Sequence, residues 1–130
     1  MRLGGIMETK DFNHSMFKFC KKLTENSVPY VKKFNFMDKV VFAPVKGGRR
    51  FIKVKYFTDR IEHDYETDTK EIVKDTKGSI HCFVEKETGD VYKPATWRAP
   101  YTKGNNCVRG NIYEPDTFRT KSMQGGWYAI

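Results

Sequence analysis

The sequence lacks the paired cysteines and histidines that build metal sites and disulfide frameworks. Its three cysteines, Cys20, Cys82 and Cys107, are odd in number, far apart, and include no CxxC pair. The three histidines show no spacing typical of zinc ligands. We therefore expect reduced thiols, as is usual in an intracellular protein, with no cofactor and no bound metal.

Long hydrophobic runs are missing as well. The longest purely apolar runs are only a few residues, whereas a helix needs about 20 residues to cross a membrane. The segment before Met7 is too short and too poor in apolar residues for a signal peptide. These absences predict a cytoplasmic protein without a membrane partner.

Aliphatic residues are scarce beside the aromatic ones. Phe, Tyr and Trp make up 15% of the 130 residues, and hydrophobic residues make up 38%. Because disordered chains lack aromatic residues, we expect a folded chain whose length fits one domain, residues 1–130. Its core is expected to be built largely on the packing of Phe and Tyr.

Hydrophobic spacing predicts one N-terminal helix followed by strands. Residues 11–25 carry apolar side chains at three- and four-residue spacing, typical of an amphipathic helix that ends in the polar, proline-containing stretch 26–29. The helical stripe comprises Phe12, Met16, Cys20 and Leu23. The expected strands are residues 30–36, 40–45, 50–57, 79–86 and 90–93.

The clearest alternation places Ile52, Val54 and Tyr56 on one face of a strand and Lys53 and Lys55 on the other. The pattern as a whole predicts an α+β fold, with the helix packed on a mainly antiparallel sheet of four to five strands. The expected segments are the helix region (1–27), the basic strands (28–57), an acidic exposed connection that could carry strand extensions at its ends (58–77), a hairpin (78–94) and an irregular Pro/Gly-rich C-terminal segment (95–130). In the hairpin, Gly89 is expected to supply the left-handed position of the turn.

The net charge of +8 is spread unevenly. Residues 1–57 carry 13 Lys and Arg against 4 Asp and Glu, whereas residues 58–77 carry 4 against 7. Residues 78–130 carry 7 against 5. The basic first half is the pattern expected of a protein whose partner bears phosphates.

The region from Ile80 to Tyr113 contains a distinctive pattern: His-Cys-Phe-Val at 81–84, Lys86, Thr-Gly-Asp-Val-Tyr-Lys-Pro-Ala at 88–95, Trp97, Ala-Pro at 99–100 and Arg-Gly-Asn-Ile at 109–112. This pattern resembles a family of small uncharacterised proteins encoded by tailed bacteriophages and some large DNA viruses. The resemblance covers residues 46–130, although the acidic stretch 58–77 is longer than usual. It implies a viral origin, and a location in the host cytoplasm or in the virion, without implying an activity.

The strongest functional candidate is a basic surface with interleaved aromatic residues. Lysine and arginine bind phosphates, and exposed rings such as Trp97 and Tyr101 can stack on unpaired bases. Nine residues form the predicted nucleic-acid or anion-binding site: Arg49, Arg50, Lys53, Lys55, Lys93, Trp97, Arg98, Lys103 and Arg109. The alternative is a solvated lysine face with Trp97 in the core. The glycines at 47–48 could let the backbone cradle an anion, but a plain hairpin turn is the favoured interpretation. The triplet 109–111 could bind a phosphate or form an ordinary turn.

No catalytic motif accompanies these residues. His81 and Cys82 are adjacent on an expected strand and should point to opposite faces, so they should not form a nucleophile pair. A pair between Cys107 and His81 has no orienting motif behind it. His63 lies in an acidic stretch that could recruit a metal, but such loop residues are usually only solvated. We therefore predict no catalytic residues, no metal site and no enzymatic activity.

These features favour a small non-enzymatic accessory protein that binds nucleic acid or another phosphate-bearing ligand through a basic sheet face. The alternative is a virion structural or assembly component, or an inhibitor of a host protein, acting by protein contacts. The apolar stretch 127–130 supports that alternative, because it could dock on a neighbour. A third reading is a small oligomer that sequesters a nucleotide. The oligomeric state and the partner are left open by the sequence.

Overall fold

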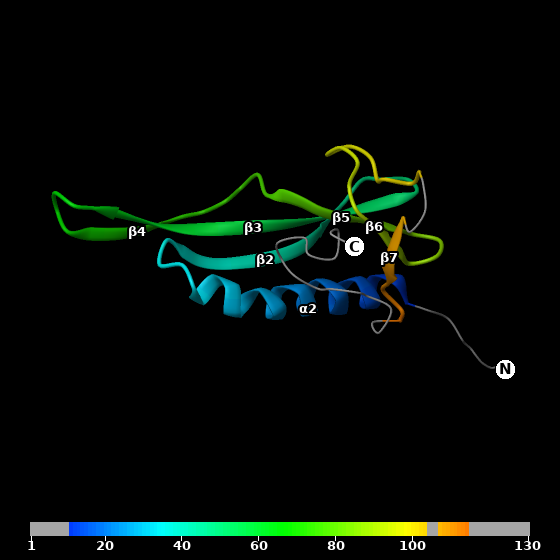
Figure 1. Ribbon diagram of the computed structural model, residues 1–130, viewed down its shortest axis with the longest axis horizontal. Coiled ribbons are helices and arrows are strands. Elements are labelled where there is room, and N and C mark those ends of the chain that lie inside the picture. Colours follow the sequence, from blue (N-terminus) through cyan, green and yellow to red (C-terminus); the bar gives the residue numbers. More distant parts are fainter. Residues whose placement is uncertain (1–10, 104–106, 115–130) are drawn as a thin grey trace.

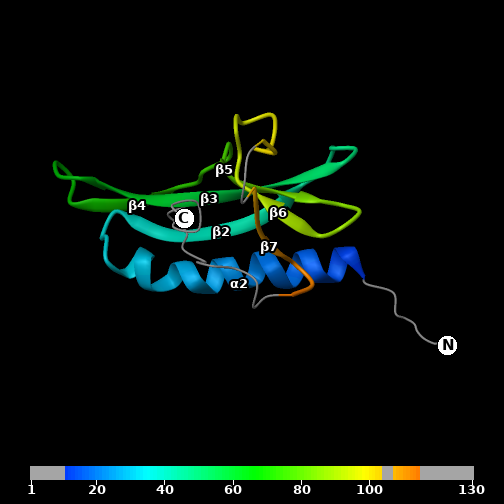
Figure 2. The ribbon, with the colours of Figure 1, turned by 45° about the vertical axis from the view of Figure 1, so that its right-hand side comes forward.

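A computed structural model describes residues 11–103 and 107–114 of the protein. One long helix, α2 (Phe12–Lys32), packs on one face of an antiparallel sheet (Figures 1 and 2). The strands are β2 (Met37–Val45), β3 (Phe51–Asp64), β4 (Thr69–Val73), β5 (Ser79–Glu85), β6 (Asp90–Tyr92) and β7 (Val108–Asn111). Their order is β2-β3-β5-β6-β7, and β4 pairs with β3 outside this path. The predicted α+β fold is confirmed, with six strands in place of four to five.

The core lies between α2 and the sheet. Helix α2 contributes the predicted stripe of Met16, Cys20 and Leu23, all of which are buried. The central strands contribute Val54 and Cys82, which are completely buried. The remaining buried members of this cluster are Phe19, Val40, Phe42, Val84, Val91 and Ile112. The core is therefore more aliphatic than the composition predicted, because most of the aromatic residues that the structure describes lie outside the buried cluster.

The helix is longer than its sequence pattern indicated. The carboxylate of Asp11 accepts a hydrogen bond from the N–H of His14 and caps the N-terminus. The predicted end at 26–29 is wrong, because α2 continues through Pro29 to Lys32. A proline inside a helix removes one backbone hydrogen bond, but the side chains that follow it pack against the core. This packing extends the helix into the region where residues 30–36 had been expected to form a strand.

The acidic stretch 58–77 forms most of a two-stranded arm. Strand β3 continues to Asp64 and returns as β4, and the arm extends beyond the end of α2 (Figures 1 and 2). Ile61 pairs with Ile72 across the two strands. The two isoleucines come from different strands and are eleven positions apart in the chain. Neither strand of the arm therefore shows the alternation of apolar and polar residues that would predict it from sequence. The segment is exposed as expected, but regular pairing replaces the irregular connection.

The carboxylate of Asp75 fixes the return of the chain from the arm to β5. It accepts backbone hydrogen bonds from Gly78 (2.9 Å), Thr58 (2.9 Å) and Lys77 (3.1 Å). These bonds favour the ionised form, so they lower the pKa of Asp75 below its ordinary value of 3.8. The backbone N–H of Asp75 in turn donates to the carboxylate of Asp59, whose pKa is also lowered.

Replacing Asp75 by Asn is expected to lower the melting temperature by about 5 °C at pH 7, because an amide cannot accept all three bonds. A lowered pKa stabilises the fold above the ordinary value and loses that effect as the pH falls through the folded-state pKa. The difference between wild type and Asp75→Asn should therefore shrink below about pH 4. Thermal melts from pH 7 to pH 2.5 measure it, with Glu66→Gln at the exposed arm tip as the control. A difference that stays constant with pH would contradict this role of the ionised carboxylate.

The C-terminal part is more regular than expected. The triplet 109–111 lies in β7, which pairs with β6, and not in a turn. Beyond β7, Tyr113 lies in a turn, and the rest of the expected irregular segment, from residue 115 onward, lies outside the described residues. The apolar stretch 127–130 lies outside them as well.

Candidate functional site

The face of the sheet opposite α2, here called the outer face, carries the predicted lysines. Val54 belongs to the core between α2 and the sheet, and Ile52 and Tyr56 pack against that core. Because side chains alternate along a strand, Lys53 and Lys55 project from the outer face, as the sequence predicted. In the described part of the chain, no helix covers this face (Figures 1 and 2).

Three aromatic rings, those of Phe51, Phe83 and Tyr92, pack together on the outer face. The ring of Phe51 meets the ring of Phe83 with centroids 6.5 Å apart and that of Tyr92 at 5.6 Å, both edge to face. Phe83 is only 2% exposed. The rings therefore pack as a second, smaller apolar layer on the side of the sheet that α2 does not reach.

A compact loop, residues 93–103, rises above the sheet on the side away from α2 (Figure 1, yellow). The hydroxyl of Thr96 accepts hydrogen bonds from the N–H groups of Arg98 (3.1 Å) and Ala99 (3.2 Å). Lower down, the N–H of Ala95 donates to the carbonyl of Ala99. A bridge between the two prolines, 94 and 100, closes the base. The loop is thus hydrogen-bonded within itself and holds Trp97 at its tip.

Trp97 brings the loop and the strand together. Its side chain is 64% exposed, so the alternative that it fills the core is wrong. The Lys53 ammonium lies 5.0 Å from the centroid of the Trp97 ring, and the Arg98 guanidinium lies 4.8 Å from the same point. A second pair lies nearer the loop base, where the Lys93 ammonium is 5.0 Å from the Tyr101 ring.

We call Lys53, Lys93, Trp97, Arg98 and Tyr101 the Trp97 cluster. Among residues 11–103 and 107–114, none of its three cations pairs with a carboxylate. Their charges are therefore not neutralised by described acidic side chains, and they are held over aromatic rings on a face open to solvent.

Two arginines of the predicted site have other roles. The Nε atom of Arg50 donates to the carboxylate of Glu85 at 2.8 Å, and this bond lowers the pKa of Glu85. Arg109 is 94% buried, since only 6% of its surface is exposed, so it cannot reach a ligand on the surface. Burial contradicts the expectation that Arg109 binds a ligand. The expectation for Arg50 stays a prediction, because its side chain is 68% exposed although its charge is paired with Glu85.

The remaining predicted residues, Arg49, Lys55 and Lys103, take no part in the described cation–ring contacts of the cluster. Arg49 is exposed in the turn before β3. Lys55 donates to the carbonyl of Lys77 at 3.0 Å, on the outer face. Lys103 is exposed at the end of the loop, where its carbonyl accepts a hydrogen bond from the Cys107 thiol.

His81 and the cysteines Cys20 and Cys82 are all buried. The ring of His81 packs edge to face on Phe42, with centroids 5.0 Å apart, and Cys82 lies in the core. A register shift in β5 leaves His81 as a bulge residue, so both side chains are buried and the expected opposite orientation is wrong. Burial raises the pKa of Cys20 to about 12 and that of Cys82 well above 9.0, so neither thiol ionises at neutral pH.

The described residues do not meet the requirements of a metal site with three or more such ligands, or of a membrane-spanning helix. Within 11–103 and 107–114, no group of three or more His, Cys, Asp or Glu is placed to hold a metal ion. His63, which had been considered as a metal ligand, bonds to Asp68 at 2.9 Å at the exposed arm tip. Over the same residues, no helix has the length and apolar character needed to cross a membrane.

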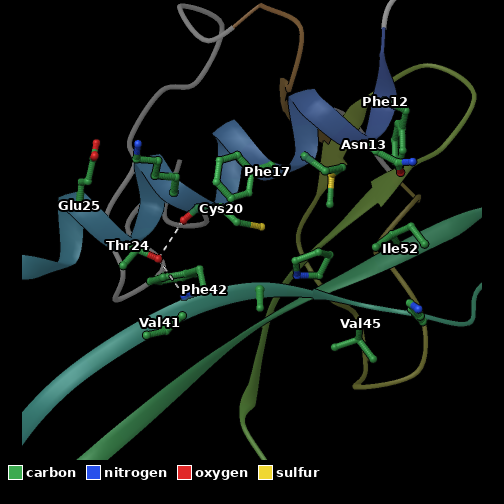
Figure 3. Close-up of a pocket in the computed structure, with 15 residues that line it drawn as sticks. Phe12, Asn13, Phe17, Cys20, Thr24, Glu25, Val41, Phe42, Val45 and Ile52 are labelled. Carbon is green, nitrogen blue, oxygen red and sulfur yellow. Dashed lines mark hydrogen bonds between the residues drawn. The ribbon is translucent and has the colours of Figure 1, made fainter.

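An apolar groove of about 840 Å³ lies between the first half of α2 and the second half of β2 (Figure 3). Phe17, at its opening, is 64% exposed. The hydroxyl of Thr24 accepts a hydrogen bond from the backbone N–H of Phe42 at 2.9 Å, and Pro44 has no N–H. This edge of β2 therefore offers few free backbone donors with which a further strand could pair. Sequence reasoning missed the groove, because it depends on where α2 lies relative to β2.

Fold and surface together define a small α+β protein with one helix-covered face and one open face that is basic and aromatic. Residues 7–127 match the model of a family of unknown function (DUF7717), and the chain belongs to this family. No curated protein and no solved structure matches the chain.

Proposed function

We propose that this is a small non-enzymatic viral accessory protein that binds nucleic acid, or another phosphate-bearing ligand, through its outer face. The Trp97 cluster is the observation that carries the proposal. It places cations that pair with no described carboxylate beside exposed rings, and this combination suits phosphates that are linked to bases. The resemblance of the 81–112 pattern to phage and large-virus proteins supports the viral origin, with action in the host cytoplasm or in the virion.

The charge distribution also supports this proposal. The acidic arm lies at one end of the elongated sheet, while the Trp97 cluster lies toward the other end (Figure 1). A polyanion is therefore attracted to the cluster and repelled from the arm. The net charge of the whole chain, +8, attracts a polyanion whichever way the protein is turned toward it.

Fluorescence anisotropy with a labelled single-stranded oligonucleotide tests the proposal. If Lys53, Lys55, Lys93 and Arg98 each contact a phosphate, affinity is expected to fall about 50-fold between about 50 and about 200 mM salt. Binding that is absent even at about 20 mM salt would end the proposal, because electrostatic attraction is strongest there.

A second candidate function, contact with a protein as an assembly component or as an inhibitor of a host protein, is supported by the groove of Figure 3. The occupant that fits is an apolar helical segment flanked by carboxylates. The groove is lined by apolar side chains, and Lys21 and Lys46 are exposed among its lining residues. A strand fits less well, because Thr24 and Pro44 limit pairing at this edge.

A further inference from the structure

The ring of Trp97 lies at the tip of a small loop that is hydrogen-bonded within itself. Hydrogen bonds to Thr96 and the bridge between Pro94 and Pro100 fix the loop in the free protein. The ring is 64% exposed, compared with 36% for Tyr101. An exposed aromatic ring on an ordered loop loses little conformational freedom when a planar ligand stacks on it.

The partners of Trp97 in the free protein are replaceable. Lys53 and Arg98 contact the ring only as cations over an aromatic face, at 5.0 and 4.8 Å from its centroid. Cation–ring contacts at exposed sites are weaker than the stacking of a nucleic-acid base on an aromatic side chain. A base can therefore take the place of a cation, and the displaced cation then lies beside the phosphates that flank that base.

We infer that Trp97 stacks on an unpaired base of a single-stranded nucleic acid, while Lys53 and Arg98 move from the ring to the adjacent phosphates. This inference rests on the proposed function and names its ligand class. It excludes duplex as the preferred ligand, because bases in a duplex are already stacked on one another and their faces cannot reach a ring at a loop tip.

The test uses the full chain with Trp127→Phe, which leaves Trp97 as the single tryptophan of the sequence. Three probes carry eight phosphates each: a 5′-phosphorylated oligothymidylate of eight residues, a 5′-phosphorylated abasic strand of the same length, and a duplex of four base pairs whose two strands are joined by a non-nucleotide linker through two phosphodiesters, so that the duplex has no unpaired base. Oligothymidylate is expected to quench the fluorescence of Trp97 and to bind at least about tenfold more tightly than the other two. Trp97→Leu is expected to bind oligothymidylate only as tightly as the abasic strand, with an unchanged melting temperature.

A further variant, Lys53→Met, separates stacking from phosphate contact. It is expected to weaken binding of both single strands while oligothymidylate still quenches Trp97 at saturation. Equal affinity for oligothymidylate and the abasic strand, or binding of oligothymidylate without quenching, would overturn the stacking inference while the proposed function stands. Absence of binding by all three probes at low salt would overturn both.

Discussion

Reversing the charges of Lys53 and Arg98 together, as Lys53→Glu with Arg98→Glu, is expected to reduce affinity for a single-stranded oligonucleotide at least 100-fold at low salt. Each change replaces attraction for phosphate by repulsion, and a factor of ten per site corresponds to about 1.4 kcal/mol. The two cations lie over the same Trp97 ring, so both changes act at one place. Anisotropy titration of the labelled oligonucleotide measures the loss.

The matched control is Lys18→Glu with Lys22→Glu on the exposed side of α2. It changes the net charge by the same amount but on the helix side of the sheet, so it is expected to weaken binding less than tenfold. An equal loss of affinity in the outer-face variant and in this helix variant would show that net charge, and not the outer face, governs binding. Arg50 is unsuitable for this test, because its reversal would place two carboxylates together at Glu85 and change stability as well.

Gly89→Ala is expected to destabilise the fold by about 2–5 kcal/mol and to lower the melting temperature by roughly 10 °C or more. Gly89 turns the chain between β5 and β6 with a φ of +79°, a left-handed conformation that side chains disfavour. An added Cβ would also lie 2.6 Å from a ring carbon of Tyr113, which packs against the core. The prediction that this glycine occupies the left-handed position of the turn is confirmed.

Gly47→Ala provides the comparison for Gly89. Gly47 also has a positive φ, +122°, but an added Cβ would meet no atom within 4 Å. Gly47→Ala should therefore destabilise the fold only through backbone strain, by about 1–3 kcal/mol. Its melting temperature in thermal melts should lie between those of wild type and Gly89→Ala. If both variants melted at the same temperature, the contact with Tyr113 would not contribute.

The sequence predicted the parts of the fold and site that depend on local spacing. Alternation along one strand was enough to place Lys53 on the face opposite Val54, and the turn residue Gly89 was enough to locate the β5–β6 hairpin. The sequence also assigned Lys53 and Trp97 to one predicted site. In the structure the Lys53 ammonium lies 5.0 Å from the centroid of the Trp97 ring.

The features that sequence reasoning missed all depend on contacts between distant residues. Arg50 meets Glu85 across 35 positions, and nothing near Arg50 in the chain indicates that its charge is paired. Arg109 lies in a short strand that exists only because β6 lies beside it. Pro29 was expected to end the helix, whereas packing of the following turn against the core keeps it helical.

The most direct test of the central claim is the salt dependence of oligonucleotide binding for wild type and for the neutral variant Lys53→Ala with Arg98→Ala. If these two cations contact phosphates, the plot of log affinity against log salt should become shallower by about 1.4 in the variant, since each single-strand contact contributes about 0.7. An unchanged slope would show that phosphates are bound elsewhere on the protein, and would contradict the assignment of the outer face as the binding surface.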